Sequence, residues 1–161
     1  MDLVDWMMIH NRGGRYAFYD DLVKECVQAL LTDEERKKAH EITVRYYERF
    51  YDGYRRGDKS KISEVFEYLY HLVECSKLEK VWEIVNDEKV FYDLYSNVNL
   101  EEFAKVLEKF HKKLDNYERA KIASRIARVY SRLGWHDKSL KILQKNFGCL
   151  KDAKKLLIGM R

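Results

Sequence analysis

The chain has 161 residues, of which 46% are hydrophobic and 36% are charged, with a net charge of +4, seven glycines and no proline. This composition excludes disorder and is typical of one globular, mostly helical domain. The three cysteines, Cys26, Cys75 and Cys149, are odd in number and far apart. Their placement excludes a disulfide framework or a zinc-binding pair, and it indicates reduced thiols inside a cell.

The first residues of the sequence and its charged composition indicate where in the cell the protein acts and what kind of organism it comes from. Residues 1–5 are acidic, and no apolar run approaches the roughly 18 residues of a membrane span. We therefore expect a cytoplasmic protein that does not enter a membrane. Abundant Lys, Glu and Arg beside only two Gln is a composition typical of thermophile proteins. Residues 99–161 carry sixteen basic and seven acidic side chains, so positive charge gathers in the last third.

The first predicted element is a β-hairpin over residues 6–18. Two short apolar and aromatic runs flank Asn11-Arg12-Gly13-Gly14, and Asn and Gly tolerate the positive φ of a tight hairpin turn. Asp20 is the predicted N-cap of a helix over residues 21–31.

A second helix is predicted to begin after Thr32, because Thr32 and Glu35 have the spacing of a capping box. It is expected to end between Gly53 and Gly57. Its predicted core face consists of four residues at helical spacing, Ala39, Ile42, Tyr46 and Phe50. Three tyrosines, Tyr47, Tyr51 and Tyr54, share a neighbouring face. We expect these tyrosines to pack on another helix, with a binding patch as the alternative.

From Lys61 onward the pattern predicts successive helices over residues 61–76, 78–86, 88–97, 100–114, 117–133, 136–147 and 151–159. The stretch 123–143 resembles a tetratricopeptide repeat at Ala123, Ile126, Ala127, Tyr130, Leu133, Gly134, Trp135, Ser139 and Leu143. Nearly identical pentapeptides at 105–109 and 141–145 agree with a degenerate repeat. The expected fold is all-α, with antiparallel hairpins in a right-handed superhelix. The small Ala127 and Ser139 are predicted to pack together.

The N-terminal half also resembles a known junction. Phe18-Tyr19-Asp20 followed by Leu22-Val23, then Glu34-Glu35-Arg36 with His40, is similar to the end of the winged helix in signal-transducing (STAND-type) ATPases of the AP-ATPase and NB-ARC kind. In that family helical repeats follow, and residues 68–72 resemble the first repeat helix. The resemblance implies a winged-helix edge over residues 1–56 and tetratricopeptide-like repeats over 57–161, packed as one continuous unit. The phosphate-binding Gly-x₄-Gly-Lys-Ser/Thr loop is absent, so we expect neither ATPase activity nor a nucleotide cofactor in this chain.

No pattern of catalytic residues accompanies this resemblance. The five histidines, His10, His40, His71, His111 and His136, lie 25 to 40 residues apart, so none pairs locally on a helix face. We expect His71 to be a partly buried structural residue. Acidic pairs fall at predicted helix starts, where they complement the helix dipole. The sequence predicts no enzyme, no metal site and no cofactor.

One constellation favours binding. The basic stripe, which we define as Lys121, Arg125, Arg128 and Arg132, follows the i, i+4, i+7, i+11 spacing of one helix face. In tetratricopeptide repeats this helix lines the concave groove, so the resemblance implies that the stripe, with Ser124 and Ser131, faces an acidic peptide or partner surface. The alternative is a solvated helix face paired with Glu118 or a neighbouring helix.

Nucleic acid is the competing partner for this charge. Phosphates would be contacted by six residues outside the stripe, Arg12, Arg15, Arg55, Arg56, Lys59 and Lys61. No segment that could supply a recognition helix precedes the predicted wing. An acidic protein partner is therefore the favoured prediction, and the oligomeric state is left open.

Overall fold

The computed structural model describes residues 9–12, 15–18 and 30–146. The chain forms two compact units, Met1–Ala39 and His40–Arg161, so the division falls at residue 39 whereas the sequence suggested residue 56. In the first unit, β1 (Ile9–Arg12) pairs antiparallel with β2 (Arg15–Phe18), in a register that places Arg12 opposite Arg15.

Several sequence-based expectations fall partly or wholly outside these residues. The hairpin over residues 6–18 includes its flanks and its Gly13-Gly14 turn, so in that form it stays a prediction. The predicted cap at Asp20, most of the helix over 21–31 and the helix over 151–159 also lie outside the described residues.

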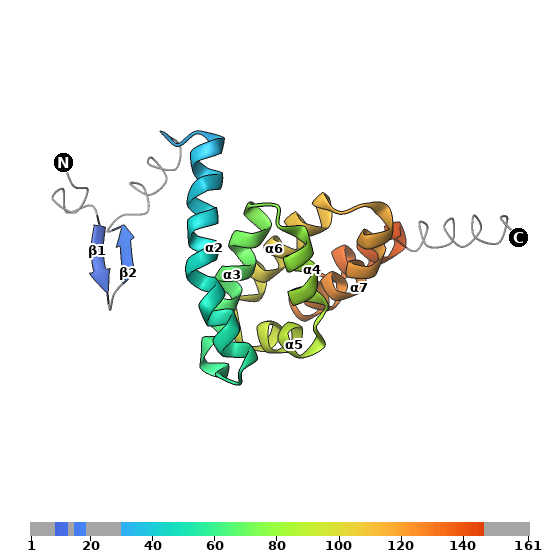
Figure 1. Cartoon of the computed structure of the whole chain (residues 1–161). Coiled ribbons are helices and arrows are strands. Elements are labelled where there is room, and N and C mark those ends of the chain that lie inside the picture. Colours follow the sequence, from blue (N-terminus) through green and yellow to red (C-terminus); the bar gives the residue numbers. More distant parts are fainter. Residues whose placement is uncertain (1–8, 13–14, 19–29, 147–161) are drawn as a thin grey trace, which may run out of the picture. The chain divides into compact units, whose positions relative to one another are not determined.

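The described part of the second unit is helical, which confirms the all-α expectation for this region. Helix α2 (Asp33–Arg55) begins in the first unit and continues into the second. The next elements are the 3₁₀ turn η2 (Lys59–Lys61), α3 (Ile62–Glu74), α4 (Leu78–Asn86), α5 (Glu88–Asn97), α6 (Leu100–Lys113) and α7 (Asn116–Arg132), and residues 136–146 are helical as well (Figure 1). The predicted ranges 78–86 and 88–97 coincide with α4 and α5. The other predicted bounds from residue 61 to residue 146 agree to within two residues. No helix in the part of the chain that the structure describes is long and apolar enough to cross a membrane.

Side-chain caps explain where these helices begin. Glu35 accepts hydrogen bonds from the backbone N–H and hydroxyl of Thr32, and the Glu35 N–H donates back to the Thr32 hydroxyl at 3.2 Å. This reciprocal pair is the predicted capping box. Asp87, Asn99 and Asp115 likewise accept backbone N–H groups at the starts of α5, α6 and α7. Each cap satisfies donors that the first helical turn leaves unpaired.

The core of the second unit is built around α3 and α6, which lie side by side in Figure 1. Leu69 and Leu72 of α3 are fully buried, and so are Phe103 and Phe110 of α6. The Phe91 ring of α5 meets the Phe103 ring with centroids 5.6 Å apart. Helix α7 packs on α6, so α6 links α7 to the rest of the core.

The predicted core face of α2 is wrong. Ile42 is 66% exposed and Tyr46 is 41% exposed, and the buried residues of α2 are Val44, Tyr51 and Tyr54. Both faces have apolar residues at helical spacing, so periodicity alone does not distinguish them. Tyr54 faces inward, where its hydroxyl donates to Asp93.

The expectation for the three tyrosines is confirmed. Tyr51 stacks on Tyr68 of α3 with ring centroids 5.5 Å apart, and Tyr47 stacks on His71 at 6.0 Å. The Tyr54 hydroxyl donates to Asp93 of α5. These contacts attach the C-terminal half of α2 to α3 and α5.

Helix α7 and residues 136–146 form a helical hairpin. The Ser139 hydroxyl donates to the Ala127 carbonyl oxygen at 2.9 Å, and both residues are buried. The predicted close approach of Ala127 and Ser139 is thereby confirmed. Gly134 adopts a φ of +76° in the turn, a conformation that glycine takes without steric cost.

Candidate functional site

The basic stripe of α7 lies against aromatic rings of α5. Each of its three guanidinium groups covers one ring. The distance from the guanidinium carbon to the ring centroid is 4.8 Å for Arg125 on Phe91, 5.2 Å for Arg128 on Tyr92 and 4.5 Å for Arg132 on Tyr95. We call these three arginines with their three rings the arginine face. Residues spaced i, i+3, i+7 on α7 thus meet residues spaced i, i+1, i+4 on α5. The three arginines share one side of α7, and on α5 Phe91 and Tyr95, four residues apart, share one side with Tyr92 beside them. Contacts of this kind stabilise by about 0.5–1 kcal/mol each at exposed sites.

Hydrogen bonds fix the same guanidinium groups. Arg125 donates to the carbonyl oxygen of Asn86, the last residue of α4, at 3.0 Å. Arg132 donates to the carbonyl oxygen of Tyr95 near the end of α5 at 3.0 Å, and Arg128 donates to the Tyr92 hydroxyl. Carbonyls in the last helical turn lack intrahelical partners and carry the negative end of the helix dipole, so they are favourable acceptors for cations.

The arginine face keeps its positive charge. Within the described residues, no carboxylate forms an ion pair with any member of the basic stripe. The groups that accept hydrogen bonds from its three arginines are two neutral carbonyls and one hydroxyl. The pKa of Arg125 depends on burial and on nearby charged side chains. Burial lowers the pKa of Arg125, Glu88 opposes this effect, and Arg128 reinforces it. Even so, an arginine guanidinium stays charged at neutral pH.

The remaining predicted binding residues differ in their placement. Lys121 is exposed, and its ammonium lies 4.3 Å from the centre of the Tyr117 ring. Ser124 is exposed and makes only a long 3.5 Å hydrogen bond to the Lys121 carbonyl oxygen. The Ser131 hydroxyl lies 3.1 Å from that of Ser139. Ser131 therefore contributes to the hairpin between α7 and residues 136–146, and Lys121 extends the arginine face by one turn.

Three of the six residues expected to contact nucleic acid are engaged by acidic or backbone groups. Arg55 lies 3.8 Å from Glu83, and Lys59 lies 3.0 Å from Asp93. Arg56 donates to its own helix at the Asp52 carbonyl oxygen. Lys61 lies 5.9 Å from the centre of the Phe50 ring. Arg12 and Arg15 face each other in the β1–β2 register, and their side chains lie outside the described residues.

The structure also brings together two histidines that sequence reasoning left apart. The Nδ1 atoms of His40 on α2 and His71 on α3 lie 2.7 Å apart, so one neutral ring donates to the other. Tyr47 stacks on His71, and the Tyr70 ring meets His40 edge-on. Residues 40 and 71 are 31 positions apart, so no local spacing could have revealed the pair.

Burial and mutual repulsion keep this histidine pair neutral. Burial lowers the pKa of His71 to about 4, with a further contribution from His40, and Glu74 opposes both effects. The pKa of His40 is also lowered, first by burial and then by Lys109. Lys109 itself is bound to Glu74 at 2.6 Å. Among the described residues, no group of three or more His, Cys, Asp or Glu side chains could hold a metal ion. The pair is consistent with the structural role expected for His71.

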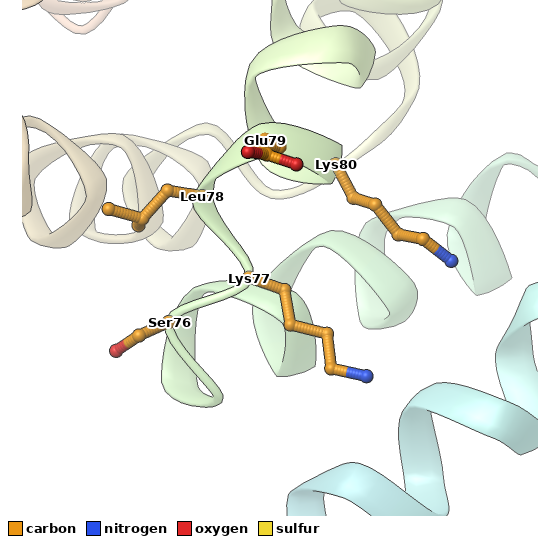
Figure 2. A pocket seen from close by; sticks show the side chains of 5 residues that line it. All are labelled: Ser76, Lys77, Leu78, Glu79 and Lys80. Carbon is orange, nitrogen blue, oxygen red and sulfur yellow. The ribbon is translucent and has the colours of Figure 1, made fainter.

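Two pockets in the surface present fewer available polar or charged groups than the arginine face does. One, of about 470 Å³, lies at the turn between α3 and α4 and is lined by Ser76, Lys77, Leu78, Glu79 and Lys80. Figure 2 shows the Lys77 and Lys80 side chains pointing away from those of Ser76 and Leu78, so few polar groups converge. The other, of about 110 Å³ between α2, α3 and α4, holds the 2.5 Å ion pair of Lys80 with Glu48. Its charges are largely paired with each other.

No family model, curated protein or solved structure matches this chain. We therefore infer the function from the site itself.

Proposed function

We propose that this protein is a non-catalytic protein-interaction or sensor arm that binds an acidic peptide or partner surface through the arginine face and Lys121. In this proposal residues 57–161 form a tetratricopeptide-like right-handed superhelix, and residues 1–56 derive from the winged-helix edge of a STAND-type ATPase. The protein acts in the cytoplasm, without an ATPase core, metal or cofactor in this chain. The helical hairpin at Ala127 and Ser139 supports the repeat assignment.

The observation that carries the proposal is that the three guanidinium groups are held in fixed positions and still have positive charge and N–H donors to offer to a partner. A guanidinium has five N–H donors, and each arginine of the arginine face uses one of them in its contact with α4 or α5. The remaining donors can bind a carboxylate in two parallel hydrogen bonds. Because rings and neighbouring oxygen atoms already hold the arginine side chains, these side chains lose less rotamer entropy when a partner binds.

A purely structural role explains the same contacts in part. Three arginines on three rings also attach α5 to α7, and that role needs no partner. It leaves Arg128 and Arg132 without an ion pair among the described residues, although a carboxylate on α5 opposite either one would add up to about 1 kcal/mol to the attachment. Exposed Lys121 and Ser124 also lie outside the α5 contact. These features favour binding over attachment alone.

Fluorescence anisotropy with a labelled glutamate-rich peptide tests the proposal. The charge-reversed Arg128→Glu/Arg132→Glu protein should lose binding, whereas Arg45→Glu/Lys105→Glu, the same change of charge at exposed positions on α2 and α6, should retain it. Binding should weaken with salt, because exposed charges are screened over about 8 Å at physiological ionic strength. Equal loss in both double variants would show attraction to net charge only, and the proposal would fail.

Nucleic acid is the alternative partner, and one observation favours it. Tyr92 is 45% exposed and Tyr117 is 57% exposed, each beside a cation of α7, and tyrosine rings can stack on bases. Against it, Arg55 and Lys59, two of the residues predicted to contact phosphates, already lie beside Glu83 and Asp93. An oligothymidylate probe in the same assay separates the two partners.

A further inference from the structure

On the premise of the proposed function, we infer that the partner presents its acidic residues on an α-helix that lies along α7. The inference concerns the shape of the ligand, whereas the proposed function concerns its charge. It follows from the spacing, along α7, of the residues that carry the fixed guanidinium groups.

The arginine face repeats at the spacing of a helix. Arg125 and Arg128 are three residues apart and Arg128 and Arg132 are four, which corresponds to about 4.5 Å and about 6 Å along the axis of α7. Lys121, four residues before Arg125, extends the row by about 6 Å. A partner that satisfies all of these cations needs carboxylates at the same intervals.

A helix and an extended chain meet this requirement differently. Glutamates at i, i+4, i+7 and i+11 on a helix repeat at the same axial rises, in either direction along α7. Side chains on one face of an extended chain are about 6.7 Å apart. Over the length from Arg125 to Arg132 an extended acidic peptide falls out of step by about 2–3 Å, which is enough to break a bidentate hydrogen bond.

The arginines cannot readily shift to follow an extended ligand. Their rings and acceptors belong to α4 and α5, so moving one guanidinium costs both a cation–π contact and a hydrogen bond. Arg128 depends on the Tyr92 hydroxyl, and the exposed part of the Tyr92 ring offers apolar contact beside the charges. We therefore expect the partner helix to carry apolar residues next to its acidic row.

The test compares two peptides of equal charge on the full chain. The first is an alanine-rich peptide of about 20 residues, long enough to be helical, with glutamates at i, i+4, i+7 and i+11. The second has two central alanines replaced by proline, which breaks the helix and keeps every charge. We expect at least about tenfold tighter binding of the helical peptide, since the broken one must be ordered on binding. Tyr92→Phe should weaken that preference while the fold, monitored by circular dichroism, stays unchanged.

The outcomes separate this inference from the proposed function. If both peptides bind equally and both are lost in Arg128→Glu/Arg132→Glu, the helical partner is wrong and the proposed function stands. If neither peptide binds, or if the oligothymidylate alone binds, the proposed function fails and the inference fails with it. If the helical peptide is preferred but the double variant retains it, the site is elsewhere and both are wrong.

Discussion

The stability of the second unit should depend on pH through the pair of His40 and His71. The two Nδ1 atoms are 2.7 Å apart, and the rings are packed among Tyr47 and Tyr70. Such a pair holds one shared hydrogen when both rings are neutral. One added proton makes one ring cationic, and a second added proton would place two positive rings in contact, with Lys109 of α6 adding to the repulsion and Glu74 of α3 opposing it.

The sign and size of the effect follow from the pKa of His71. Its ordinary value is 6.5, and in the folded protein it is about 4. Between these values the unfolded chain binds more protons, so the free energy of unfolding falls as the pH drops from about 6.5 to about 4 and is insensitive to this group above that range. At about 1.4 kcal/mol per pH unit the upper limit is about 3 kcal/mol. Because His71 is only half-buried, solvent screening reduces this to about 1–2 kcal/mol.

Urea denaturation at a series of pH values between 4 and 8 measures this directly, by comparison of the wild type with His71→Gln. Glutamine retains hydrogen bonding but does not titrate, and the acidic residues titrate alike in both proteins, so the difference isolates the titration of His71. We expect the wild type to lose about 1–2 kcal/mol more than the variant between pH 7 and pH 4.5. Parallel curves for the two proteins would refute the reasoning.

Three further changes test the fold. Ala127→Trp should overpack the contact with Ser139 and lower the free energy of unfolding by about 1–3 kcal/mol; an unchanged melting temperature would remove the basis for the tetratricopeptide assignment. Asp115→Ala should cost about 1 kcal/mol by deleting the cap of α7, and Asp115→Asn, which still accepts the hydrogen bond, should cost much less in the same thermal scans. Tyr54→Phe should raise the pKa of Asp93 measured by carboxylate NMR, since the tyrosine hydroxyl is the largest cause of its lowering; no change would contradict the hydrogen bond.

The positions of the helices from residue 61 to residue 146 could be predicted from sequence because their signals are local. Asp87, Asn99 and Asp115 cap their helices through side chains that reach only two or three residues ahead. Which of the two apolar faces of α2 is the more buried could not be predicted, since it depends on partners far along the chain. Tyr54, for example, faces inward toward Asp93, 39 positions later.

The candidate site shows the same limit. That the four cations of the basic stripe share one face of a helix could be predicted from their spacing in the sequence alone. It could not show that rings of α5 hold the arginines, nor that Ser131 bonds to Ser139. One signal was available: aromatic residues at 91, 92 and 95 have a helical spacing that complements the arginines, though nothing local relates α5 to α7.

The most direct measurement of the central claim is an NMR titration of the labelled full chain with the helical glutamate peptide. The account predicts that the side-chain Nε–Hε signals of Arg125, Arg128 and Arg132 shift together with backbone amides of α5 and α7, with the same saturation curve. Shifts confined to α2 or to residues 55–61, or saturable shifts with oligothymidylate but not with the peptide, would contradict it.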